Sequence, residues 1–341
     1  MSPLRLAVAP LAAAWALAGL AAGAPAALGA TATDPTPTQA IAELNTWRAQ
    51  VGERPVSTTP VASWDTGCEQ ANAYDDDNQT LTHQEAQASP GYTTTGADAA
   101  SNSVLAEGGS LRAPAEASLL PGPVWDSSVF HRAALLEPRF GQTGFDASTF
   151  HPSNYQSYEC MWVQDDTTNN INAINDAVTT PGLSLYPSPA NGAYDVPTTF
   201  PGGESPDPAI ETGVPAGSTL GWLLNVEING PWSDGGNGGS VFASGVTAKL
   251  TADGTATTIP VVVSQCGSAG CFSPGGTSDG IYFGGGFGIF PTKPLKPSTT
   301  YRVQLTGGQV TDQPDSTSYP LAGFSWCFST GSSYAPSADC A

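Results

Sequence analysis

The stretch PVWDSSVFHRAALLEPRFGQTGF (residues 123–145) decides how the first part of this chain folds. Val129 and Leu136 lie seven residues apart on one helical face, and Pro138 ends the apolar pattern, so a helix is predicted. GQTGF then reads as the start of a strand. His131 lies inside the predicted helix and is one of only three histidines in 341 residues. The question is whether this histidine carries chemistry or packs in the fold.

The segment before this stretch predicts helices over roughly 38–80. TQAIAELNTWRAQVG places Ile41 and Leu44 at helical spacing, with Thr38 expected as the N-cap and Gly52 as the stop. After the quoted stretch, SYECMWVQD alternates in character and predicts a strand. Helices and strands are therefore expected together in the first part of the chain.

The apolar periodicity lapses between 166 and 185, and we expect a domain boundary there. Residues 183–331 form an array of short strand-like runs with frequent turns and no helical pattern. Asp253-Gly254 between two alternating runs predicts a β-hairpin. This pattern predicts an antiparallel β-sandwich, so the whole chain is expected to be α+β.

The charge balance excludes two classes of partner. Ten basic residues stand against thirty acidic ones, which gives a net charge of −20. A nucleic-acid partner requires a basic patch, and so few cations do not readily build one. Anionic membrane surfaces repel such a chain. We therefore expect no nucleic-acid partner and no stable membrane insertion.

The N-terminal segment predicts export. Arg5 precedes an Ala/Leu-rich run, and Ala30-Thr31-Ala32 offers a cleavage site. We expect residues 1–32 to be a signal peptide and the protein to be secreted or held at the cell surface. The alternative is a retained membrane anchor, because the apolar run approaches the length that spans a bilayer.

All six cysteines follow this segment, and an even number in an oxidising compartment indicates disulfide bonds. The domain layout favours bonds within each half of the chain. A metal site at the last four cysteines is disfavoured, because no histidine lies near them. The expected pairs are Cys68–Cys160, Cys266–Cys271 and Cys327–Cys340.

Four motifs stand in the order found in a bacterial CAP (SCP-like) domain. They are LNTWRAQVGERPV (44–56), LTHQE (81–85), GYTTTGADAASNSVLA and VWDSSVFHRAALLEPRFGQTGF. The chain resembles that family across about 125 residues. The resemblance implies a CAP-type α-β-α sandwich over residues 38–170, followed by a linker at 171–185.

The second half resembles a bacterial Ig-like domain. GIFPTKPLKPSTTYRVQL (288–305) and FSTG (328–331) carry this resemblance. It implies an all-β Ig-like sandwich over residues 186–331 and a C-terminal tail at 332–341. A sandwich of this kind says little about function.

The first resemblance also implies a cleft, which in many CAP domains holds two histidines and two glutamates. The histidines fall on His83 and His131. The glutamates would fall near Ser101 or Asn102 and near Ser128, and none of these positions is acidic. The implied cleft therefore keeps both imidazoles and lacks both carboxylates.

This residue set limits the chemistry of the cleft. Zinc sites in proteins normally have at least three protein ligands, and Glu85 and Glu107 are the only nearby acids, so His83 and His131 predict at most a weak zinc site. Without an orienting acid, general acid–base catalysis is not expected. The structural alternative is that each histidine bonds a backbone carbonyl.

The leading hypothesis is a non-enzymatic extracellular module whose cleft binds a lipid, glycan or protein ligand. The sandwich would then serve as a spacer or adhesion unit, and the segment GESPDP (203–208) as an extended linker or edge. One alternative is a metal-assisted hydrolase acting on peptide or cell-wall material through His83 and His131. The other is a structural surface protein with a vestigial cleft.

Overall fold

The described residues combine helices with three antiparallel sheets, so the α+β prediction is confirmed. Ala32–Ala341 form one compact unit. The predicted signal peptide lies outside the described residues. The computed structural model describes residues 34–109, 125, 127–149, 156–175, 177–204, 207–215, 217–232, 241–267, 270–271, 286–312, 316–334 and 340.

Helix α1 spans Pro37–Val51 and begins two positions earlier than the N-cap prediction requires. Thr36 is the N-cap: its Oγ1 accepts a hydrogen bond from the backbone of Gln39 at 3.3 Å, and the side chain of Gln39 accepts one from the backbone of Thr36. The prediction of Thr38 was wrong because Pro37 is favoured at the first helical position. The predicted stop is confirmed, since Gly52 ends the helix with φ +87°.

The LNTWR motif of α1 fixes the chain that follows the helix. The amide of Asn45 exchanges two hydrogen bonds with the backbone of Val56, at 2.7 and 3.0 Å. The Arg48 guanidinium is fully buried and donates to the carbonyl of Leu135 at 2.7 Å. It also lies 3.0 Å from the carboxylate of Glu53. These contacts tie α1 to the end of the quoted helix.

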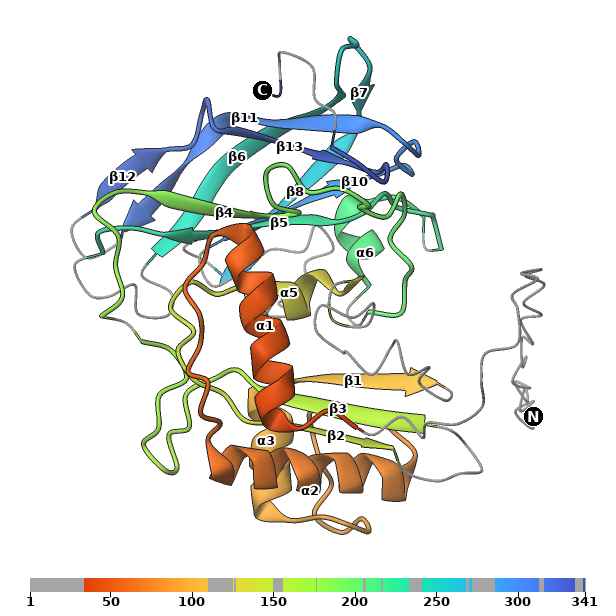
Figure 1. Cartoon of the computed structure of the whole chain (residues 1–341), viewed down its shortest axis with the longest axis vertical. Helices are drawn as coiled ribbons and strands as arrows, with labels where there is room; N and C mark the ends of the chain where they lie inside the picture. Colours follow the sequence, from red (N-terminus) through yellow and green to blue (C-terminus); the bar gives the residue numbers. More distant parts are fainter. Residues whose placement is uncertain are drawn as a thin grey trace, which may run out of the picture. The chain divides into compact units, whose positions relative to one another are not determined.

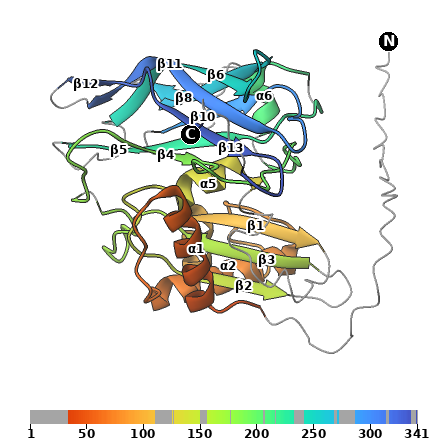
Figure 2. The same cartoon turned by 45° about the horizontal axis from the view of Figure 1, so that its top comes forward.

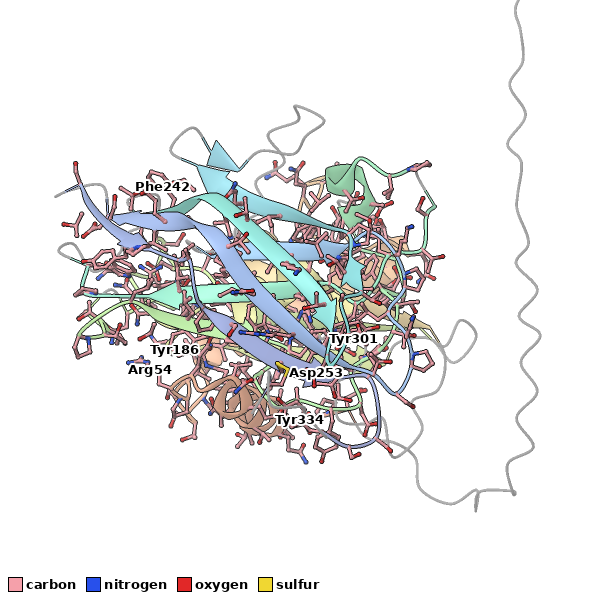
Figure 3. The ribbon with its side chains drawn as sticks, turned by 90° about the horizontal axis from the view of Figure 1, so that it is seen from above. Arg54, Tyr186, Phe242, Asp253, Tyr301 and Tyr334 are labelled. Atoms are coloured by element: carbon pink, nitrogen blue, oxygen red, sulfur yellow. A yellow bond between two sulfur atoms is a disulfide. The ribbon has the colours of Figure 1, made fainter. Side chains whose placement is uncertain are left out.

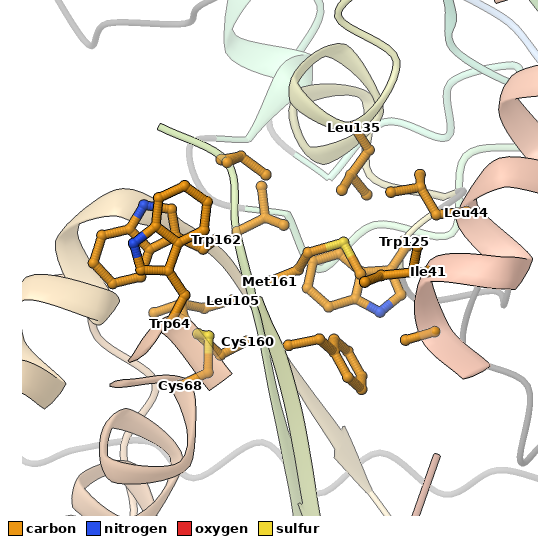
Figure 4. Close-up of a cluster of buried hydrophobic side chains, with 14 of the residues drawn as sticks. Ile41, Leu44, Trp64, Cys68, Leu105, Trp125, Leu135, Cys160, Met161 and Trp162 are labelled. Atoms are coloured by element: carbon orange, nitrogen blue, oxygen red, sulfur yellow. A yellow bond between two sulfur atoms is a disulfide. The ribbon is translucent and has the colours of Figure 1, made fainter. Parts of the chain in front are cut away.

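The first sheet has the strand order β1-β3-β2. Its strands are β1 (Ser103–Gly109), β2 (Phe145–Thr149) and β3 (Gln156–Trp162), and the helices beside it are α2 (Ala62–Asn78) and α3 (Thr94–Asn102). Helix α2 packs on one side of β3 and α1 lies on the other (Figures 1, 2 and 4). The strands predicted from GQTGF and SYECMWVQD are β2 and β3.

Side chains of β3 point alternately to the two faces of the sheet, and both faces are packed. Trp162 stacks on Trp64 of α2, with ring centroids 5.0 Å apart and planes inclined by 3°. Cys160 forms the predicted disulfide bond with Cys68 on the same side. Met161, between them, points to the opposite side of the sheet, toward α1 (Figure 4).

Two five-stranded sheets form the second part of the chain, and their facing sides bury one hydrophobic cluster (Figure 1). The first sheet contains β4 (Ser184–Ser188), β5 (Leu224–Asn229), β8 (Val261–Gly267), β9 (Gly270–Cys271) and β10 (Phe287–Pro291). The second contains β6 (Val241–Ala252), β7 (Thr258–Ile259), β11 (Thr300–Asp312) and β12 (Thr317–Pro320), and β13 (Ser325–Ser329) pairs with β11.

The hairpin predicted at Asp253-Gly254 is confirmed, because β6 and β7 pair antiparallel across it and Gly254 has φ +66° (Figure 3). The expectation that this part has no helix was wrong. Helix α6 (Pro208–Thr212) is short, and the carboxylate of Asp207 accepts a hydrogen bond from the backbone of Ala209 at its start. One turn is too short to produce a visible apolar period.

Helix α5 (Val129–Leu135) confirms the helix predicted from the quoted stretch, and it packs on the second part of the chain. Val129 and Ala133 share a buried cluster with Phe200, Leu223 and other residues of that part. The adjacent Arg132 is fully buried and donates to the carbonyl of Leu223. Helix α5 is therefore held by residues that come much later in the sequence.

Two of the three expected disulfide bonds are present, Cys68–Cys160 and Cys327–Cys340. These bonds are compatible with an extracellular protein. For the third pair, β8 and β9 bring the backbones of Cys266 and Cys271 opposite each other. The side chains of this pair lie outside the described residues.

Candidate functional site

A pocket of about 810 Å³ is lined by both histidines of the predicted site, His83 and His131. Four segments line it: the loop after α2, the middle of β1, the start of α5, and a Gly/Pro-rich loop of the second part. The lining residues are Leu81, Thr82, His83, Gln84, Leu105, Ala106, Glu107, Ser127, Ser128, His131, Phe200, Pro201, Gly202, Gly203 and Glu204.

His83 is oriented by helix α3. Its Nδ1 lies 2.7 Å from the carbonyl oxygen of Ala100 in the last turn of that helix. This contact is the backbone bond that the structural alternative expects for His83. It leaves Nε2 as the ring nitrogen available for another group.

His131 enters the pocket from α5, with its ring 5.2 Å from the ring of Trp125. Its Nδ1 is buried and has no hydrogen-bond partner among the described residues. Burial, and then the charge of His83, lower the pKa of His131 to about 4. The imidazole is therefore neutral at pH 7, and the two rings are close enough to interact electrostatically.

Glu204 was missed by the sequence reasoning, which treated 203–208 as a linker or edge. Its carboxylate accepts hydrogen bonds from Ser128 Oγ, from the backbone of Val129 at 3.1 Å and from the backbone of Phe130 at 2.8 Å. The carboxylate thus caps the first turn of α5. Burial raises the pKa of Glu204 to about 7, although these hydrogen bonds oppose the rise.

Glu107 is the second carboxylate of the pocket. It is exposed on β1, where it stands opposite Tyr158 of β3. The prediction that the cleft lacks carboxylates was therefore wrong. Glu107 and Glu204 lie elsewhere in the sequence than the family positions, and Glu204 comes from the second part of the chain.

Asp75, Glu85 and Glu107 form what we call the acidic wall. Asp75 is 1% exposed, and a backbone hydrogen bond from Thr82 reaches its carboxyl group. Burial, and then the charges of Glu85 and Glu107, raise the pKa of Asp75 to about 8. Burial also raises the pKa of Glu85 to about 7. The backbone bond from Thr82, the residue before His83, ties Asp75 to the loop that carries His83.

Three of the five predicted site residues come together in the pocket: His83, His131 and Ser128. Ser101 and Asn102 are not among its lining residues. Both bond back to Asp98 within α3, at 2.9 Å from Ser101 Oγ and 3.1 Å from Asn102 Nδ2. The helix ends at Asn102, so the pocket wall is supplied by the strand that follows.

The donor set does not complete the weak zinc site predicted at His83 and His131. Among the described residues, no group of three or more His, Cys, Asp or Glu side chains is arranged to hold a metal ion. A zinc centre needs at least a third protein ligand beside His83 and His131. No chemical step is therefore assigned to a metal.

Comparison with models of protein families gives no match for this chain, and comparison with curated proteins gives none. Within the described part of the chain, every helix is too short or too polar to cross a membrane.

Proposed function

We propose that this protein is a secreted CAP-like domain, spanning about 38–170, followed by an Ig-like sandwich at 186–331, and that it acts as a non-enzymatic extracellular binding module. The order of the four sequence motifs supports the first assignment. The two disulfide bonds and the antiparallel strands of the second half are in keeping with this proposal.

The observation that carries the proposal is the pocket itself. Its volume of about 810 Å³ lies in the range of sites for small ligands and short peptide or sugar segments. Apolar side chains such as Leu105 and Phe200 line it together with His83 and Glu107. Polar groups set beside apolar surface provide orientation and specificity for a bound molecule.

The polar groups of the pocket favour binding over turnover. The carboxylate of Glu204 is engaged at the start of α5 and is not bonded to an imidazole. His83 Nδ1 contacts a carbonyl oxygen, and His131 Nδ1 has no partner within the described residues. A general base in an enzyme is normally oriented by a further group, and the described residues supply no such acid to either ring.

The pocket also changes the role proposed for the second half of the chain. Phe200 and Glu204 belong to the predicted sandwich, and both line the pocket. The sandwich therefore contributes to recognition, rather than serving only as a spacer or adhesion unit.

The test is retention of a ligand without conversion. The full chain is incubated with a randomised pentapeptide library and with digested cell-wall peptidoglycan, and bound species are identified by native mass spectrometry. We expect retention of intact molecules by the parent chain. The double variant His83→Ala/His131→Ala should lose retention and keep its circular dichroism spectrum. Glu69→Gln, on the exposed side of α2, is the matched control.

Two other results would contradict the proposal, and each would favour one of the alternative functions. Product formation that chelator and the double variant both abolish would favour a metal-assisted hydrolase. No retention from either mixture would favour a structural surface protein with a vestigial cleft.

A further inference from the structure

The acidic wall places carboxyl groups on one side of the pocket, and Glu107 is its exposed member. Glu107 lines the pocket directly, and Asp75 is near enough to interact electrostatically with both Glu107 and Glu85. The described residues that line the pocket include no lysine and no arginine. His131 is neutral at pH 7 because its pKa is lowered to about 4.

Each buried member of the wall has at least one carboxyl oxygen without a hydrogen-bond partner in the described part of the protein. Asp75 is 1% exposed, and its Oδ1 has no hydrogen-bond partner among the described residues. Both carboxylate oxygens of Glu85 are also buried and have no hydrogen-bond partner among the described residues. Burial keeps Asp75 largely protonated at pH 7 and Glu85 partly so, and a positive charge brought close favours their ionised forms.

The same pocket offers an apolar surface beside the acidic wall. Leu81 is 38% exposed, and Leu105, Phe200 and Pro201 also line the pocket. A lysine side chain has a flexible four-carbon stem that packs on apolar surface and a compact ammonium head that carries the charge. An amino sugar carries its ammonium group on a hydroxylated ring and would leave this apolar surface uncovered.

Building on the proposed binding function, we propose that the pocket binds a lysine side chain of a peptide ligand. The ammonium group lies against Glu107, where its charge favours the ionised forms of Asp75 and Glu85, and the stem packs on Leu81 and Phe200. The ligand of the module is then a basic peptide segment.

Two blocked pentapeptides test this inference on the full chain by isothermal titration calorimetry. Both have glycine at four positions, and the central residue is lysine in one and Nε-acetyllysine in the other. We expect the lysine peptide to bind at least about tenfold more tightly, and the difference to shrink in high salt. Glu107→Gln should abolish the difference, Glu85→Gln should reduce it, and the control Glu69→Gln should keep it.

The outcomes separate this inference from the proposed function. Equal affinity for the two peptides would overturn lysine recognition. So would tighter binding of a glucosamine disaccharide, which would identify an amino sugar as the ligand. If neither pentapeptide binds and the randomised library is still retained, lysine recognition fails and the binding function stands. If the library is not retained either, both fail.

Discussion

Replacing Asp75 by asparagine should remove a pH-dependent cost of folding. The carboxyl group has a pKa of about 8 in the folded protein, against an ordinary value of 3.8. Between these values the unfolded chain has released the proton and the folded chain retains it, so stability falls as pH rises from about 4 to 8. The substituted amide would resemble the protonated acid at every pH, since its oxygen can still accept the bond from Thr82.

The stability that Asp75→Asn should gain follows from the size of the pKa shift of Asp75. Each pKa unit corresponds to about 1.4 kcal/mol, so the shift from 3.8 to about 8 sets an upper limit of roughly 5–6 kcal/mol. Relaxation and water entry reduce such costs in real proteins, so we expect Asp75→Asn to gain about 2–4 kcal/mol over the parent chain by pH 8. The charges of Glu85 and Glu107 also oppose ionisation of Asp75, so they act in the same direction as burial.

The assay is urea unfolding of the full chain at pH 5, 6, 7 and 8. The parent chain and Glu69→Gln, which loses one exposed carboxylate from the same helix, should lose stability in parallel as pH rises. Asp75→Asn should lose clearly less. If the free energy of unfolding falls by the same amount for Asp75→Asn and the parent chain from pH 5 to pH 8, Asp75 does not retain its proton and the reasoning is refuted.

Three further changes test the packing. Cys68→Ala/Cys160→Ala should lower the free energy of unfolding by about 4–5 kcal/mol, because the bond spans a sequence separation of 92; a urea-measured loss below about 1 kcal/mol would contradict the loop-closure estimate. Gly144→Ala should cost on the order of 3 kcal/mol in thermal unfolding, since an added Cβ would lie 2.4 Å from a side-chain carbon of α2, and an unchanged melting temperature would exclude that clash. In a double-mutant cycle, Ser128→Ala and Glu204→Ala should couple by about 1–2 kcal/mol, whereas additive losses would show that their hydrogen bond contributes nothing.

Local patterns predicted the elements well where the apolar spacing is regular. Val129 and Leu136 marked the helix of the quoted stretch, and the alternation through Cys160 marked β3. The N-cap was misplaced by two residues, although Pro37 at the first helical position and the capping box of Thr36 with Gln39 both favour Thr36. Helix α6 was missed because one turn leaves no period to detect.

The candidate site was predicted in part. His83 and His131 were found from motif order, and the pocket holds both. Glu204 was not found, because it lies 76 residues beyond Ser128 and no local pattern links the two. The available signal was the pair of acids in the Gly/Pro-rich run PGGESPDP, together with a helix start whose first turn lacks an acid.

The loop that carries Phe200 and Glu204 forms part of the pocket rim, yet it lies outside the hydrophobic core that holds Trp125, the neighbour of His131. Natural variation in this loop could therefore redirect which molecule the pocket accepts while the tryptophan stack and the buried disulfide of the first core stay as they are. Exchanging only the loop that carries Phe200 and Glu204 between homologous chains would then transfer ligand preference from one chain to the other.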